Sequence, residues 1–157
     1  MSEQAVFSYL GTLLGSASVA SCSPNTGRNT IARTFTNPPE VLQAADFPAI
    51  VLSKDFDFTN SFVIDSVGGG QHRYQVLCDL LLGISATPLP ELHARALPWG
   101  SAIGKLLNGD RTLGGNALAD FTPGGDVIAS YTINQIGYGG QQDYFGLTFK
   151  LPITEDL

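Results

Sequence analysis

The chain has 157 residues, of which 43% are hydrophobic and only 14% charged, and this balance is typical of one globular domain. Eight basic residues lie scattered among fourteen acidic ones, so no basic patch favours sequence-independent binding to a phosphate backbone. The sequence contains no apolar run of membrane-spanning length, and its acidic start differs from a secretory signal. We therefore expect a protein that is made in a cytoplasm, stays soluble and has no membrane partner.

The first predicted element is an amphipathic helix over residues 2–14, which Gly15 ends. Residues 16–34 are polar and rich in turn formers, and they predict a long loop or arm. The two prolines after Asn37 predict a capped short helix that reaches about Ala45.

Three strands follow in the first half of the chain. Residues 48–53 form a compact apolar strand, and residues 61–67 and 73–82 give the clearest hairpin pattern, joined by glycines 68–70. In 73–82 one face is apolar and the other face is partly apolar, which predicts packing on both sides of the strand.

The second half is predicted to contain one helix and three strands. The helix covers residues 91–107, with a kink or break expected at Pro98. A short strand over 117–121 and longer strands over 127–136 and 144–153 come after it. Runs of strands in place of strand–helix alternation favour an α+β fold: a single domain with a mostly antiparallel β-sheet, on which an N-terminal helix and a central helix pack.

The few groups capable of chemistry are dispersed. His72 follows three glycines, where an exposed polar tip is expected, and His93 is expected on a solvated helix face. Cys22 and Cys78 lie in unlike surroundings and are interpreted as a loop thiol and a small buried residue rather than a disulfide. These four residues lack the spacing of a zinc site, so no metal is expected.

Glycine clusters and paired acids are the remaining candidates, for a phosphate-binding loop and for acid–base catalysis respectively. Glycines 68–70 and 114–115 lack the phosphate-loop pattern and are better explained as tight turns. Asp120 and Asp126 bracket a turn in which aspartate is common, and no serine-nucleophile motif is present. We therefore expect a protein that is not an enzyme and needs no cofactor.

The order of elements resembles one known family. Its markers are the strand that opens on Phe47-Pro48, the helix containing Trp99, the turn over 113–115, and a last hairpin containing Gly137-Tyr138 and residues 144–149. Over about residues 3–153 this order resembles the tail terminator, or tail-completion, proteins of long-tailed bacteriophages.

That resemblance implies a structural virion protein, made in the host cytoplasm, that forms a ring, most often a hexamer, at the head-proximal end of the tail tube. Its partners would be further copies of itself, the tail tube protein and a neck or head-completion protein, and DNA would pass through without specific binding. Two alternatives stay open: another head–tail joining protein or a tail-tube subunit, and a small hydrolase or ligand-binding domain with a closed pocket.

Three segments are candidates for a role in such a ring. Two glycine-rich turns are candidate assembly contacts, and their residues are Gly68, Gly69, Gly70 and Gln71 in one and Gly137, Tyr138, Gly139, Gly140 and Gln141 in the other. Asp55 and Asp57 are candidates for an acidic lining of the central hole, where basic residues would hold the DNA by counterion release. The alternatives are ordinary hairpin turns and solvated loop acids.

Overall fold

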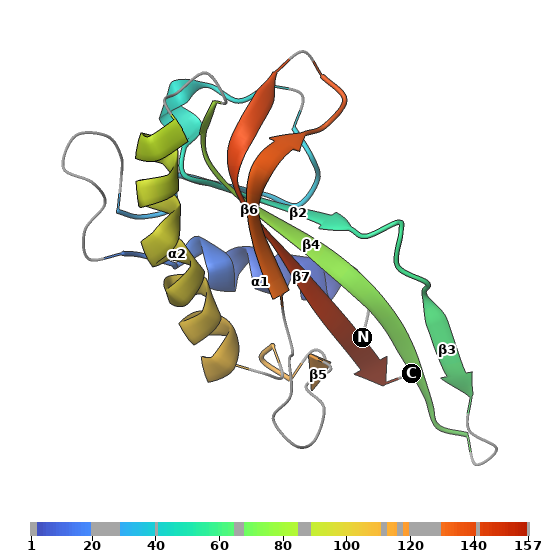
Figure 1. Cartoon of the computed structure of the whole chain (residues 1–157). Helices are drawn as coiled ribbons and strands as arrows, with labels where there is room; N and C mark the ends of the chain where they lie inside the picture. The colour runs from blue at the N-terminus through green and yellow to red at the C-terminus, as the bar shows by residue number, and fades with distance from the viewer. Residues whose placement is uncertain are drawn as a thin grey trace.

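The computed structural model describes residues 3–19, 29–39, 41–64, 68–84, 89–110, 113–115, 118–119, 130–140 and 142–156 (Figure 1). Its helices are α1 (Glu3–Gly15), a 3₁₀ turn η1 (Ala44–Asp46) and α2 (Leu89–Gly109). Its strands are β1 (Arg33–Phe35), β2 (Ala49–Lys54), β3 (Ser61–Ile64), β4 (Gly70–Ile84), β5 (Leu118–Ala119), β6 (Ser130–Gly137) and β7 (Asp143–Asp156).

Two long antiparallel strands, β4 and β7, form the centre of one seven-stranded sheet. At the edge of β4 away from β7, β3 pairs with the first residues of β4 and β2 pairs with its later residues. At the edge of β7 away from β4, β6 pairs with the first part of β7 and β5 pairs with residues near its end. Among the strand pairs that the structure describes, only β1 and β2 are parallel. The predicted α+β class with a mostly antiparallel sheet is confirmed.

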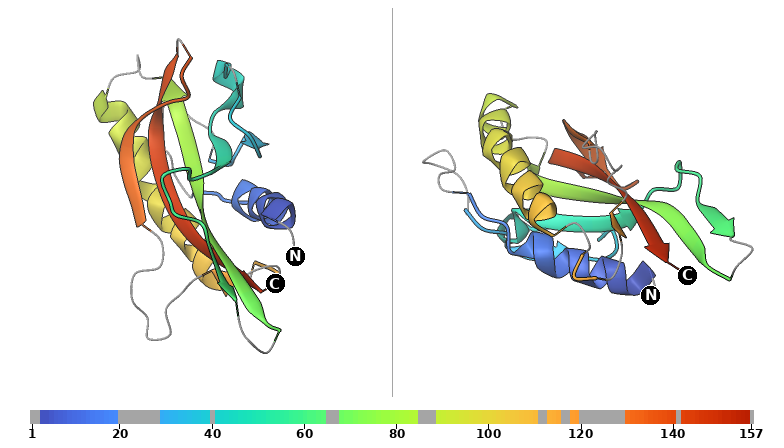
Figure 2. Two further views of the ribbon diagram at one scale, coloured as in Figure 1. Left: turned by 90° about the vertical axis from the view of Figure 1, so that its right-hand side faces the viewer. Right: turned by 90° about the horizontal axis from the view of Figure 1, so that it is seen from below.

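Both helices contribute to the larger core (Figure 2). The even-numbered side chains of β4 from Tyr74 to Leu82 alternate onto one face, as the period of a strand requires. Against them pack Leu10 of α1 and Trp99 of α2, each fully buried. The inward set predicted for the last strand is also buried, namely Phe145, Leu147, Phe149, Leu151 and Ile153.

A second, smaller core covers the opposite face of the sheet. Val51, Leu81 and Tyr144 are buried there together with Leu42, which precedes η1. Packing on both faces of the strand 73–82 is therefore confirmed.

The short helix predicted up to Ala45 was wrong. Only the turn η1 is helical; residues 41–43 are irregular, and Glu40 lies outside the described residues. The Leu42 backbone N–H donates a hydrogen bond to the hydroxyl of Tyr144 at 3.1 Å, and the Gln43 backbone N–H donates one to the Asp46 carboxylate at 2.8 Å. These side-chain acceptors hold the backbone in a non-helical path that buries Leu42.

A kink or a break was predicted at Pro98, and of these two the break is absent, because α2 runs as one helix with Pro98 inside it. A proline in a helix removes one backbone hydrogen bond. Ala96, Trp99 and Ile103, on either side of it, are fully buried, and their burial stabilises a continuous helix.

The segment 16–34 is only partly the loop or arm that the sequence predicts. Ala17 and Val19 are buried in the larger core, Ser18 bridges to Thr30, and residues 33–35 form β1. Residues 20–28, with Cys22, lie outside the described residues, as do Ser2, Asp120, Asp126 and Gln141. Cys78 is a free, buried thiol. Neither described helix combines the length and apolar character that a membrane crossing requires.

Candidate assembly surface

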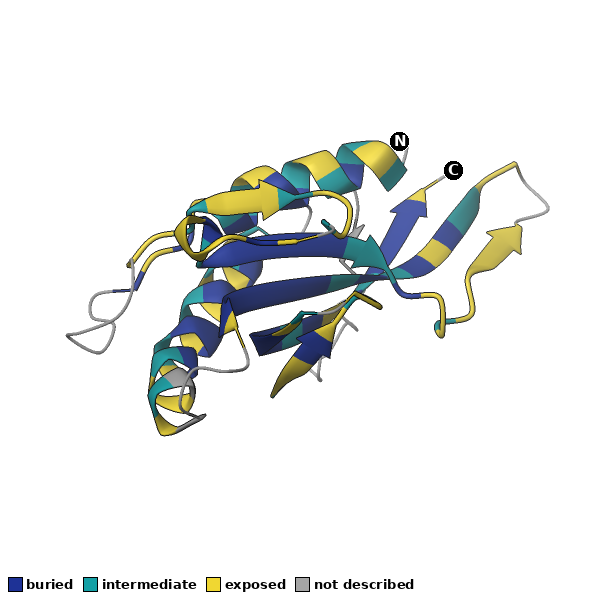
Figure 3. Cartoon of the chain, turned by 90° about the horizontal axis from the view of Figure 1, so that it is seen from above, coloured by how far each residue is buried: buried dark blue, intermediate teal, exposed yellow. Residues whose placement is uncertain are grey.

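One end of the sheet projects beyond the helices as an arm, made of β3 and residues 68–73 (Figure 1). All four residues of β3 are exposed, and three of them are apolar. The exposed fractions are 62% for Phe62, 45% for Val63 and 85% for Ile64. Figure 3 shows the contrast between this exposed strand and the buried strands of the body. We call this part of the molecule the strand arm.

The segment that leads into the strand arm is also apolar and exposed. Phe56, in the turn after β2, is 92% exposed. Among the described residues eight large apolar side chains are exposed, and four of them lie between Phe56 and Ile64. Such a concentration marks an interaction surface more often than scattered single side chains do.

His72 anchors the strand arm to the body, and its predicted exposure was wrong. Its ring stacks on Phe62 of β3 at 4.6 Å between centroids and lies 4.9 Å from the ring of Tyr74. Two carboxylates flank it: Glu3 Oε1 is 3.6 Å from Nε2, and Glu155 Oε2 is 3.8 Å from Nδ1. His72 is buried because α1, β3 and β7 all converge on this point of β4.

The acids around His72 have further partners within the fold. The Lys54 ammonium bonds Glu3 Oε1 at 2.8 Å, and the Tyr74 hydroxyl donates to Glu155 Oε1 at 2.8 Å. Burial raises the pKa of Tyr74, and its bond to the Glu155 carboxylate raises it further. The root of the strand arm is thus a paired polar network, whereas its outer surface is apolar.

The two proposed lining acids differ in their surroundings. Asp55 is buried; its Oδ1 accepts the Asp57 backbone N–H at 3.0 Å and its Oδ2 accepts the Gln75 amide at 2.5 Å. That carboxylate organises the turn after β2. Asp57 is exposed and makes no such side-chain contact among those described. Of the pair, Asp57 is the residue that presents a charge to solvent.

The structure brings these acids close to one of the two glycine-rich turns. Asp55 and Asp57 line an open hollow of about 540 Å³ together with Gly137 and Tyr138. In its wall the Tyr138 hydroxyl donates to Asp79 Oδ2 at 2.7 Å. The turn between β6 and β7 is therefore tethered to the sheet within the subunit.

Asp79 is a second buried acid in the lining of this hollow. The Thr148 hydroxyl donates to its Oδ1 at 2.8 Å, opposite the bond from Tyr138. Burial raises the pKa of Asp79, and the two hydrogen bonds oppose that rise in part. No local sequence pattern singles out Asp79, because its partners Tyr138 and Thr148 lie far from it along the chain.

The other glycine-rich turn lies far from this hollow, at the tip of the strand arm. Gly68 adopts a φ of +90°, and Gly68 and Gly69 are exposed. Gly70 and Gln71 begin β4 and pair with Ile64 and Val63. In the other turn Gly139 has a φ of +79°, so both turns contain a glycine in the left-handed region, as tight turns require.

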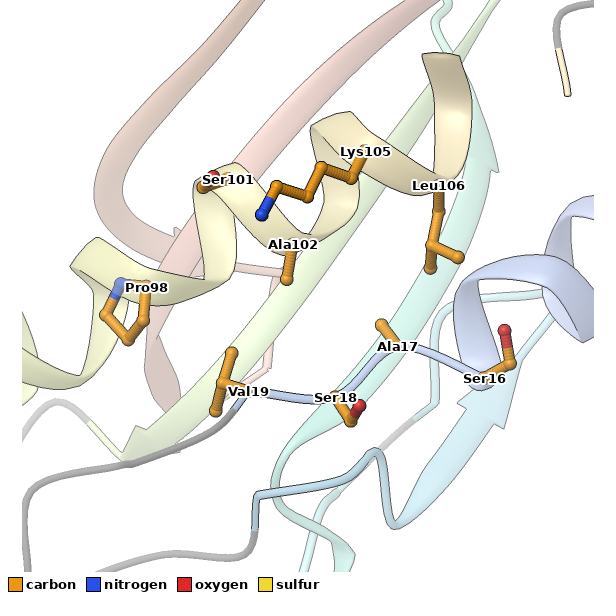
Figure 4. Close-up of a pocket in the computed structure, with 9 residues that line it drawn as sticks. All are labelled: Ser16, Ala17, Ser18, Val19, Pro98, Ser101, Ala102, Lys105 and Leu106. Atoms are coloured by element: carbon orange, nitrogen blue, oxygen red, sulfur yellow. The ribbon is translucent and has the colours of Figure 1, made fainter. Parts of the chain in front are cut away.

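Another hollow, of about 350 Å³, lies between α2 and the chain after α1 (Figure 4). Small side chains such as Ala17, Ser18 and Ser101 line it, with Lys105 at its edge. Among the described contacts, no hydrogen bond joins Lys105 to a serine of this lining. Within the described ranges no cluster of three metal-ligating side chains occurs either.

Comparison with known proteins adds no relative: no family model matches the chain, and no curated protein is similar to it.

Proposed function

We propose that the chain is a structural virion protein, the tail terminator of a long-tailed bacteriophage. In this role copies of it form a ring, taken to be a hexamer, on the head-proximal end of the tail tube. The ring ends tube polymerisation and offers its other face to a neck or head-completion protein. The chain is then a non-enzymatic assembly component, located in the virion and made in the host cytoplasm.

The observation that carries the proposal is the strand arm. Its apolar side chains, above all Phe62 and Ile64, are exposed to solvent in the single subunit. Only 14% of the residues are charged, so the chain has few charged side chains to offset this apolar surface. Burying one such apolar side chain in a contact stabilises the complex by about 1.5–3 kcal/mol. An obligate assembly uses surface of this kind. The resemblance in the order of elements supplies the identity of the assembly.

The proposal predicts that tail tube and tape-measure proteins are encoded beside the gene of this chain, and the direct test co-expresses the chain with them. We expect tubes of one length, each with a ring of this protein at one end in class-averaged electron micrographs. Tubes of uncontrolled length without such a ring would overturn the proposal. The protein alone should stop at single rings or stay monomeric, whereas long tubes formed by the protein alone would make it a tube subunit.

A ring around the exit path of the genome must let DNA slide. Asp57, exposed beside the hollow, is the better of the two proposed lining acids, since Asp55 is held within its turn. Asp57→Lys should leave rings assembled and slow genome ejection more at low than at high salt, because counterion release adds attraction. Ejection at the parent rate in low salt would remove the acidic lining from the proposal.

A further inference from the structure

We propose that adjacent copies of this chain join by strand pairing, with the outer edge of β3 in one copy bonded to the outer edge of β6 in the next. This inference rests on the proposed ring and names the surfaces that close it. Its occupant is a second copy of the chain.

The first surface is the free edge of β3. Within the described residues β3 pairs only with β4, so its other edge presents backbone N–H and C=O groups without strand partners. Its sequence, Ser-Phe-Val-Ile, contains no charge and no proline. Natural proteins usually protect exposed edges with lysine, proline or a bulge, and β3 has none of these devices.

The second surface is the free edge of β6. This eight-residue strand pairs only with β7 among the described strands, and its sequence is likewise free of charge and proline. Tyr131 is 52% exposed, and Thr132, Asn134 and Gln135 are exposed as well. The other two outer strands are poor templates, because β5 has two residues and β1 has three, one of them Arg33.

Charge favours these two surfaces as contacts between copies. Each copy carries a net charge of −6, so copies repel one another overall, and a contact without charged side chains adds no close like-charge pairs to that repulsion. No residue of β3 or β6 carries a charge; three of the four residues of β3 are apolar, and β6 combines apolar with neutral polar residues. The two edges also offer complementary arrays of backbone donors and acceptors, as in the addition of a strand to a sheet.

The placement of the two edges decides the symmetry of the assembly. β3 lies outside β4 and β6 lies outside β7, so they are on opposite sides of the sheet (Figure 1). A contact between unlike surfaces runs head to tail, and it closes into a ring or continues as a filament. A contact of β3 with β3 would instead give a two-fold dimer and stop there.

The test is disulfide trapping in a Cys22→Ser background, with diamide as the oxidant that takes up the two thiol hydrogens. The double variant Val63→Cys with Asn134→Cys places one thiol on each edge, and a second pairing with Thr132→Cys covers the neighbouring register. Diamide is added to each variant in two samples, one of concentrated free protein and one of protein bound to tail tubes. We expect a ladder of cross-linked species up to the ring size from a double variant and only monomer from each single variant.

The outcomes separate this inference from the proposed function. Rings seen at the tube end without any ladder from either double variant would overturn the strand pairing and leave the terminator role intact. A dimer from Val63→Cys alone would replace it with a two-fold β3 contact. A ladder that continues into open filaments would support the strand pairing while contradicting the terminator role.

Discussion

The two ends of β4 lie in opposite surroundings although they belong to one strand. From Cys78 to Gly83 every residue is buried between the two cores, whereas at the other end the paired strand β3 is exposed throughout. Burial within the chain explains the apolar residues of the body. It does not explain Phe62 and Ile64, which contribute little to the subunit's own core. Their burial has to come from outside the subunit, and this difference is the basis for assigning assembly to the strand arm.

The largest effect is expected in the body, at Gly146. A Cβ at this position would lie 1.9 Å from the carbonyl oxygen of Leu80, so the backbones of β4 and β7 would have to separate. Gly146→Ala should therefore lower the free energy of unfolding by about 3 kcal/mol or more in denaturant titrations. Gly104→Ala is the matched control: nothing lies near its Cβ, and the helix should gain about 0.5–1 kcal/mol. Equal effects of the two changes would contradict this account of the body.

The strand arm should show the reverse pattern, with small effects on stability and large effects on assembly. Ile64→Lys alters a side chain that is 85% exposed, so the free energy of unfolding should change by less than about 0.5 kcal/mol. Rings at the tube end should be lost, since each contact loses roughly 1.5–3 kcal/mol of apolar burial.

Leu97→Lys is the matched control for that experiment, because Leu97 is 60% exposed on α2, away from the strand arm. It should leave both stability and rings unchanged. Loss of rings in the Leu97 variant with normal rings in the Ile64 variant would move the assembly surface from the strand arm to α2.

A smaller effect is expected at Asp79, through pH. Its pKa is raised in the folded state, so the stability tied to its protonated form is present at low pH and is lost as pH rises through the folded pKa. Asp79→Asn stays neutral and avoids that loss. The melting temperature of the variant relative to the parent should therefore rise between about pH 4 and pH 7.

Asp46 supplies the opposite sign as a control. The Gln43 backbone N–H and then the Arg33 guanidinium lower its pKa, so its contribution is present at neutral pH and is lost as pH falls. Asp46→Asn should approach the parent in melting temperature only in acid. The same pH trend in both variants would mean that the surroundings of Asp79 are misassigned.

The body could be predicted from the sequence further than the strand arm. Alternation identified β7 and its inward side chains because the period of a strand is a local property. β1 was missed, since its parallel partner β2 is distant in sequence and Arg33-Thr34 is polar. The burial of His72 depends on Glu3 and Glu155, and that of Asp55 on Gln75, none of which a local pattern brings close.

Hydrogen exchange compared between the free subunit and the tube-bound assembly tests the central claim most directly. Residues 61–64 and 68–71 should gain strong protection on assembly, because their backbone becomes buried and ordered. Residues 78–83 should stay equally protected in both states, and the turn 137–140, already tethered through Tyr138, should gain less than the strand arm. Unchanged protection across the strand arm in assembled rings would contradict the account.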